Sequence, residues 1–237
     1  FLKHKLIMKC NYVTTEDKNR LSKNGIFIKG ITFYVKTFFK LVLIILTFLL
    51  LLKIMKIDLS FLTDAIISDA YEIRNKGLVF TSFFVVLFGP LIEELGFRFA
   101  LSFKRVHIFI SVSVLSFMFL SLWLGRGFFA DILFKALISL LIGSATLLVN
   151  QKRYDIVQQK YGLQIIWLTI MLFGFSHIVN YKIENFMQIP IALMMCLPQV
   201  LMGIVFTYFR LNLGFLFGLL LHSLINGISF SFSLLVT

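Results

Sequence analysis

Residues 78–103 read LVFTSFFVVLFGPLIEELGFRFALSF, and this stretch decides the fold class. Most of it is as apolar as lipid hydrocarbon, and it is longer than the roughly 20 residues that a helix needs to cross a bilayer. Inside it lie two acids and a base, Glu93, Glu94 and Arg98. A charged side chain near the bilayer centre costs roughly 2.5–3.5 kcal/mol on insertion scales. A membrane helix with three of them is therefore a candidate functional site.

The composition of the whole chain is that of a membrane protein. Its 237 residues are 59% hydrophobic and only 14% charged, and the mean hydropathy is +0.94, above the usual soluble range. Apolar runs of this length can satisfy their backbone groups in lipid only as helices or closed barrels, and these runs are long enough for helices. The sequence therefore predicts an all-α fold, a polytopic transmembrane bundle.

Seven apolar runs, separated by charged or turn-forming residues, predict about seven membrane helices. They cover residues 33–52, 78–103, 106–124, 129–149, 163–181, 187–209 and 213–235. We expect two parts in the chain: a basic cytoplasmic N-terminal segment, 1–32, and an integral membrane domain, 33–237.

The net charge of +12 is explained by topology rather than by nucleic-acid binding. Nine of the 23 basic residues precede Leu41, where they act as a topology signal and as a contact for anionic headgroups. With the N-terminus inside, fifteen basic residues lie in inner segments and seven in outer ones. The positive-inside rule then predicts a cytoplasmic N-terminus and, with seven spans, an external C-terminus; the membrane expected is the plasma (inner) membrane of a bacterium.

The first polar set is Glu93, Glu94 and Arg98. Glu94 precedes Arg98 by four residues, which is the favourable order for an ion pair on one helix face. That pairing leaves Glu93 rotated by about 100°, where a carboxylate suits a general base. The alternative is a purely structural ion-pair cluster near the lipid headgroups, which the nearby Lys104 and Arg105 keep open.

Two further polar sets contain the two histidines of apolar helices. His177 ends the sequence FGFSH, and His222 begins the sequence HSLIN, which ends at Asn226. The spacing of four puts His222 and Asn226 on one helix face, roughly 6 Å apart along the axis. Each residue has a structural alternative, because His and Asn side chains hold helices together in lipid. Taken jointly, the three sets favour one shared site.

In this order, the three sets resemble the CAAX-protease and bacteriocin-processing family of intramembrane proteases, also called the CPBP or Abi family. The motifs are Glu-Glu-x-x-x-Arg at 93–98, Phe-x-x-x-His at 173–177 and His-x-x-x-Asn at 222–226, with Pro90 where the family often has proline. The resemblance covers residues 78–232. Two features depart from the family: a phenylalanine follows the arginine where glycine is common, and two extra helices separate the first two motifs.

The resemblance implies an intramembrane endopeptidase that hydrolyses a peptide bond in a membrane-anchored polypeptide, lipid-modified or bacteriocin-related. Glu93 and His177 would activate the attacking water. His222 and Asn226 would hold a metal or the developing oxyanion. The remaining motif residues would fix the shape of the site; these are Glu94 and Arg98.

Two cofactor states are compatible with the resemblance. Glu93, His177 and His222 could bind one divalent metal, zinc, as three ligands with a free position. The same side chains could equally run a metal-free, glutamate-type reaction. In either case we expect these three side chains roughly 4–7 Å from one another. Simple helices would place Glu93 and His177 at different depths, so we expect Pro90 to distort the second span or the fifth to begin after residue 163.

Two other functions are alternatives to a peptidase. One is a proteolytically inactive membrane protein that serves in interaction or bacteriocin immunity. The other is a transporter with a buried charge relay. A transporter predicts pseudo-symmetric halves with matching broken helices, and no internal repeat is visible in the sequence.

Overall fold

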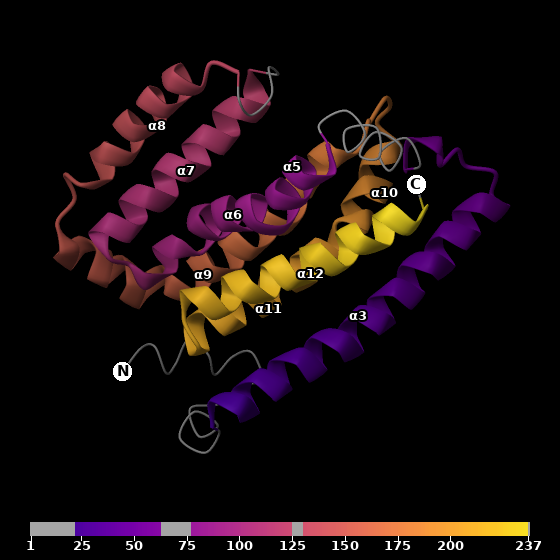
Figure 1. Cartoon of the computed structure of the whole chain (residues 1–237), viewed down its shortest axis with the longest axis horizontal. Coiled ribbons are helices and arrows are strands. Elements are labelled where there is room, and N and C mark those ends of the chain that lie inside the picture. Colours follow the sequence, from indigo (N-terminus) through magenta and orange to yellow (C-terminus); the bar gives the residue numbers. More distant parts are fainter. Residues whose placement is uncertain (1–21, 63–76, 125–129, 237) are drawn as a thin grey trace. The chain divides into compact units, whose positions relative to one another are not determined.

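The computed structural model describes residues 22–62, 77–124 and 130–236, and every regular element in these ranges is a helix (Figure 1). Within these three ranges, six helical segments are long and apolar enough to cross a membrane. They are Lys23–Ile54, Leu78–Phe97, Arg105–Trp123, Gln151–Asn180, Gln188–Asn212 and Phe215–Leu234. The predicted all-α, multi-pass membrane fold is confirmed.

Among the described residues six helical segments are long enough to span, so the predicted number of about seven is only approximate. The fourth predicted span, 129–149, corresponds to α8 (Ile132–Thr146), which has 15 residues. At 1.5 Å per residue it is about 22 Å long, shorter than the hydrocarbon core of about 30 Å. The apolar run of the sequence includes the turns at both ends of α8, and this made the span look longer than the helix.

Two helices begin well before the apolar runs that predicted them. Helix α3 (Lys23–Ile54) starts ten residues before the predicted span, so it includes the end of the predicted N-terminal segment. Helix α9 (Gln151–Ser176) includes the polar stretch at 151–160, which we expected to be a connection. Lys, Arg and Gln are good helix formers, and no Gly or Pro interrupts the stretch. Residues 1–21 of the N-terminal segment lie outside the described residues.

The chain divides into two compact units. Within the described residues, the first unit comprises Leu91–Thr169 together with Ser22, and the second comprises Lys23–Pro90 and Ile170 to the C-terminal helix.

The first unit is built on the antiparallel pair α7 (Arg105–Trp123) and α8, which lie side by side (Figure 1). Close approach is possible because Gly143 has no side chain: a Cβ there would lie 3.0 Å from the Phe109 carbonyl and closer still to the Ser113 hydroxyl. Small residues of this kind let membrane helices pack backbone to backbone.

Hydrogen bonds join the beginning of α7 to the beginning of α9. The Gln151 side chain accepts from the Arg105 backbone N–H at 3.2 Å and donates to the Phe103 carbonyl at 2.9 Å. The Arg105 guanidinium donates to the Leu147 carbonyl, just after α8. The short helix α8 therefore returns to the end of the unit from which α7 starts.

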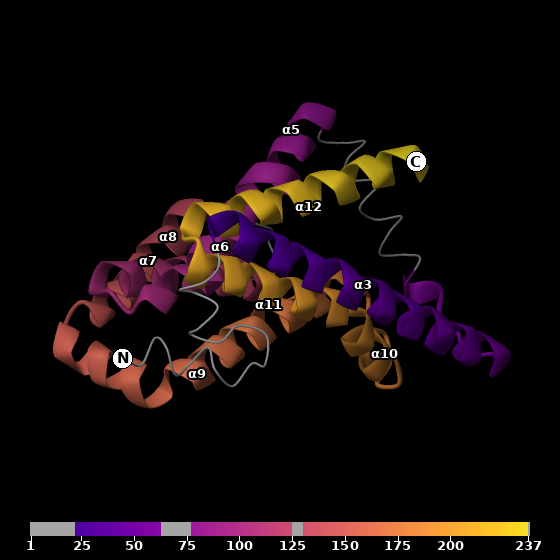
Figure 2. The same ribbon diagram turned by 90° about the horizontal axis from the view of Figure 1, so that it is seen from below.

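In the second unit, α11 (Leu197–Asn212) contacts both α3 and α12 (Phe215–Val236), and Figure 2 shows α3 running along α11. Gly30 of α3 lies directly on the aromatic rings of α11, since a Cβ there would be 2.8 Å from Phe209 and 2.9 Å from Tyr208. The turn into α12 is made at Gly214, whose φ of 105° favours glycine.

The pairing of α9 with α11 also depends on a glycine. A Cβ on Gly174 would lie 2.7 Å from the backbone N and Cα of Val200. On the opposite side of the contact, Gly203 lies against Phe173, with 3.2 Å between a hypothetical Cβ and the ring. These contacts bury Phe173 completely and position the FGFSH motif.

Candidate functional site

The helical run that carries the acidic motif changes type just before Pro90. Helix α5 (Leu78–Phe83) is followed by a π-helical turn, η1 (Phe84–Phe88), and then by α6 (Gly89–Phe97). The Gly89 N–H donates to Phe84 O, five residues back. Proline has no N–H and its ring crowds the preceding turn, which favours such a local change. The distortion that we expected at Pro90 is therefore a π turn in a run that stays helical, whereas the fifth span begins earlier than predicted, not later.

The predicted ion pair between Glu94 and Arg98 is confirmed. The Arg98 Nη1 donates to Glu94 Oε1 at 2.5 Å. The two side chains are 0% and 1% exposed. The pair is therefore enclosed by protein, at the end of α6.

Glu93 lies beside this pair and is only half-buried. It acts electrostatically on the Arg98 guanidinium, as Glu94 does. The acidic motif is in the last turns of α6, because this helix ends at Phe97 and not at 103 as predicted. Glu93 is thus the less enclosed residue of the two, although its Oε2 is buried, and Glu94 is fully enclosed.

A serine for which the sequence predicted no role stabilises the end of α6 by hydrogen bonds. The Ser111 hydroxyl of α7 donates to the Leu95 carbonyl at 2.7 Å and accepts from the Ala100 N–H at 2.8 Å. Both partners are backbone groups that helix geometry leaves unsatisfied near a helix end. The only sequence signal was a serine in an apolar helix, which is too common to assign a role.

His177 starts a short 3-10 helix, His177–Asn180, at the end of α9. Its Nδ1 lies 2.9 Å from the Phe173 carbonyl, one turn back. A carbonyl can only accept, so Nδ1 carries the proton and the neutral ring has its lone pair on Nε2. This is the tautomer and the fixed ring orientation that a base or a metal ligand needs.

His222 is buried among phenylalanines in the second unit. It is 2% exposed and is stacked on Phe206, with ring centroids 4.4 Å apart and an angle of 22° between the planes. Phe173 contacts both histidines edge to face, with centroids 5.2 Å from His177 and 5.8 Å from His222. One fully buried ring therefore links the second and third motifs.

Asn226 joins α12 to the π turn. Its Nδ2 donates to the Val85 carbonyl at 3.1 Å. Val85 precedes Glu93 by eight residues in the same helical run. The third motif is thus hydrogen-bonded to the helical run that leads into the first motif.

The six motif residues divide between the two units. Glu93, Glu94 and Arg98 belong to the first, and the residues of the second are His177, His222 and Asn226. Within either unit, no three His, Cys, Asp or Glu side chains among the described residues gather closely enough to hold a metal ion. The predicted approach of Glu93 to the two histidines stays a prediction.

Lys135 is a buried charge that the sequence interpretation counted as an external topology residue. It lies in α8, is 1% exposed, and its ammonium is 5.4 Å from the centroid of the Phe117 ring on α7, in the geometry of a cation–π contact. The signal that could have found it is a single lysine inside the apolar run LFKAL.

Comparison with known proteins adds no further site residue. No family model matches this chain, and no curated protein or solved structure matches it either.

Proposed function

We propose that this protein is an intramembrane endopeptidase of the CPBP type, which hydrolyses a peptide bond in a membrane-anchored polypeptide. The observation that carries the proposal is the acidic set of α6: a partly exposed glutamate, Glu93, next to the enclosed Glu94–Arg98 ion pair. Buried ionisable groups in a membrane helix are expensive, and their usual explanation is a functional site. A histidine of defined tautomer and a second, enclosed histidine supply the remaining groups that hydrolysis requires.

In the proposed reaction, Glu93 accepts a proton from a water molecule as the water oxygen attacks the carbonyl carbon of the scissile bond. His177 orients this water through the lone pair on Nε2, because Nδ1 is committed to the Phe173 carbonyl. General-base catalysis of this type contributes about 10²–10⁴-fold. Glu94 cannot replace Glu93, since it is already bound to Arg98.

The negative charge that develops on the carbonyl oxygen requires hydrogen-bond donors. We assign this part to His222 and Asn226; the second N–H of the Asn226 carboxamide would donate while the first stays on Val85. Collapse of the tetrahedral intermediate breaks the C–N bond, and the proton taken up by Glu93 passes to the leaving amine. The products are a carboxylate and an amine.

A zinc ion would need ligands from both units, Glu93 from one and His177 and His222 from the other. His177 fits such a role, because a metal-binding histidine usually donates its other ring N–H to a carbonyl or carboxylate. His222 fits it less well, because its ring is stacked on Phe206 and contacted by Phe173.

The proposed location is the inner membrane of a bacterium, with the N-terminus in the cytoplasm and its basic residues against anionic lipid. The substrate is a polypeptide held at the membrane by a lipid group or an apolar segment. The multi-pass arrangement of apolar helices supports a substrate that is also in the membrane.

The test is hydrolysis by the full chain in liposomes that contain lipid-anchored and single-span reporter peptides. In ¹⁸O-labelled water, wild-type protein is expected to place one ¹⁸O in the new carboxylate. Glu93→Gln should abolish cleavage without loss of folding, whereas the control Glu184→Gln changes an exposed glutamate and should leave cleavage intact. His177→Ala should also fail, and the double variant should be no worse, because residues that act as one unit are not additive.

A second candidate is a membrane protein that uses the same residues only for packing. Its support is that Asn226 bonds to a helix carbonyl and His222 is enclosed by aromatic rings, both of which are packing contacts. The two candidates differ in their response to Glu93→Gln. If this variant fully replaces the wild type in cells, the biological role does not need proteolysis.

A further inference from the structure

The carbonyl group of Val85, in the π turn, receives no hydrogen bond from the backbone of its own helical run. In an α-helix it would accept from the Gly89 N–H, but that N–H donates to Phe84 O instead. In a continued π-helix it would accept from residue 90, five residues ahead, and Pro90 has no N–H. The change of helix type and the proline therefore act together on this one carbonyl.

Side chains of the same run cannot replace the missing donor. Earlier in the run, Thr81 and Ser82 each donate a hydroxyl to the carbonyl four residues back, at 3.0 and 2.6 Å. The residues at the corresponding places after Val85 are Phe88 and Gly89, whose side chains carry no donor. An unsatisfied carbonyl in a membrane span is costly, because lipid offers it no donor. The bond therefore has to come from another helix.

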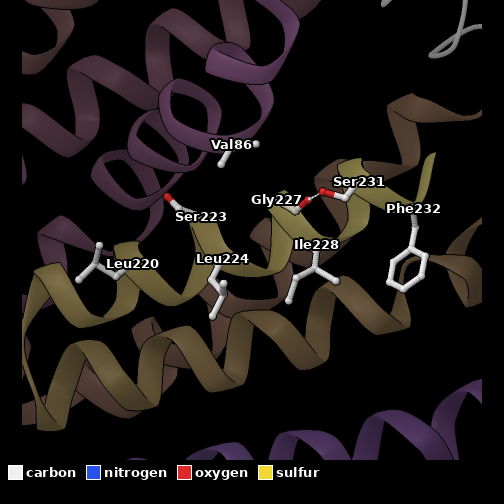
Figure 3. A pocket seen from close by; sticks show the side chains of 8 residues that line it. All are labelled: Val86, Leu220, Ser223, Leu224, Gly227, Ile228, Ser231 and Phe232. Carbon is white, nitrogen blue, oxygen red and sulfur yellow. Dashed lines mark hydrogen bonds between the residues drawn. The ribbon is translucent and has the colours of Figure 1, made fainter. Parts of the chain in front are cut away.

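Asn226 of α12 supplies that bond, with 3.1 Å between its Nδ2 and Val85 O. Helix α12 is in direct contact with the π turn at this level, since a Cβ on Gly227 would lie 3.5 Å from Val86 Cγ1. Figure 3 shows Val86 facing this stretch of α12, between Ser223 and Gly227. Both bonded residues belong to the second unit, so the contact lies within one compact body.

We propose that Pro90 is a positioning residue for Asn226. Because the proline leaves the Val85 carbonyl without a donor from its own helix, this carbonyl becomes the fixed acceptor for one hydrogen of the Asn226 carboxamide. The carboxamide is planar, so the direction of its second N–H is fixed as well. That second N–H is the one assigned above to the developing oxyanion. The catalytic consequence therefore rests on the proposed function, whereas the coupling of Pro90 to Asn226 does not.

A double-mutant cycle in detergent unfolding tests the coupling. Asn226→Ala alone should lower Tm by about 2–4 °C, the shift expected for one lost hydrogen bond. In Pro90→Ala the new N–H reaches Val85 O directly, or the turn relaxes to an α-helix in which the Gly89 N–H reaches it. Asn226→Ala should then lower Tm by less than half as much. Pro90→Val, which keeps more of the volume of the buried ring, should give the same result.

The matched control is Pro198→Ala, in the first turn of α11. A proline in a first turn replaces an N–H that has no partner within its helix, so this change brings no new donor to Val85. Asn226→Ala should cost the same Tm in the Pro198→Ala background as in the wild type. Equal losses of Tm in the wild-type and Pro90→Ala backgrounds would overturn the proposal.

The orientation of the carboxamide is measured separately by NMR of the full chain, with ¹⁵N-labelled asparagine, in lipid nanodiscs. The side-chain signals of Asn226 are those that disappear in Asn226→Ala. One of its two Nδ2 protons should exchange with water at least tenfold more slowly than the other, and Pro90→Ala should remove most of this difference. Unchanged side-chain signals of Asn226 in Pro90→Ala would overturn the positioning role.

Peptidase kinetics give a third readout and keep the two proposals apart. If the chain cleaves the reporter peptides, Pro90→Ala should lower kcat at least tenfold with little change in KM, because an oxyanion donor acts in the transition state. An unchanged kcat would overturn the role of Pro90 in catalysis. If the wild-type chain cleaves no reporter, the proposed function fails, and the thermal and NMR measurements still decide whether Pro90 positions Asn226.

Discussion

Removal of Arg98 is the perturbation that tests most sharply how the acidic set is stabilised. Arg98→Ala would leave the Glu94 carboxylate, which is 0% exposed, without the Nη1 partner that now lies at 2.5 Å. Breaking a buried ion pair by removing one partner costs about 3–5 kcal/mol, since the remaining charge is neither hydrated nor neutralised. Deletion of a fully buried side chain also leaves a cavity, which adds to the loss.

The assay is thermal unfolding of the purified full chain in detergent, monitored by tryptophan fluorescence. A second measurement is the amount of protein that accumulates in the membrane. For a chain of this size, 1 kcal/mol shifts Tm by about 2–4 °C. Arg98→Ala should therefore lower Tm by about 6–20 °C. The control Arg153→Ala removes an exposed arginine and should shift Tm by less than about 2 °C.

The double variant Glu94→Gln/Arg98→Met separates charge from packing. It removes both charges and keeps most of the volume, so it should recover at least half of the Tm lost in Arg98→Ala. An Arg98→Ala protein with unchanged Tm would refute the reasoning. If that protein were stable but inactive, Arg98 would act directly in catalysis instead.

Five further variants test the packing around the second and third motifs. Gly174→Ala places a Cβ 2.7 Å from the Val200 backbone and should lower the free energy of unfolding in detergent by about 3 kcal/mol. The matched control Gly227→Ala has its nearest contact at 3.5 Å and should be neutral or stabilising. Equal effects of the two variants would contradict the close approach of α9 to α11. Phe173→Ala removes the ring between the two histidines and should cost about 3–5 kcal/mol, and Phe173→Leu should recover most of it. Asn226→Ala loses the bond to Val85 and should cost only about 1 kcal/mol; a much larger loss in cleavage than in stability would separate its proposed catalytic part from its packing part.

The apolar pattern was sufficient to predict the fold class, because membrane helices differ from other segments mainly in composition. The same pattern was a poor guide to helix ends. It detects the hydrocarbon boundary, whereas α3 and α9 continue through polar residues that form helix equally well in water. It also merged α8 with its flanking turns into a span longer than the helix itself.

For the site, the spacing of residues within one helix predicted the local ion pair, whereas the contacts between different helices were not predicted. The Glu94–Arg98 pair follows from residues four apart on one helix. The support of α6 by Ser111, the bond from Asn226 to Val85 and the contacts of Phe173 with both histidines all join different helices. Lys135 was wrongly counted among the outer basic residues for the same reason, since only the packing of α8 on α7 shows that this lysine is buried.

We propose that Glu93 and the two histidines act together, and a cysteine pair tests this proposal most directly. Glu93→Cys/His177→Cys, in the Cys10→Ser background, would be treated in native membranes with an oxidant or a short bifunctional thiol reagent, and the cross-linked peptides identified by mass spectrometry. Ser102→Cys/His107→Cys is the positive control, because the Ser102 Oγ lies 2.6 Å from the His107 Nδ1. A shared site at the expected separation of about 4–7 Å predicts cross-linking of both pairs. Efficient reaction of the control pair with none between residues 93 and 177 would contradict the proposed active site.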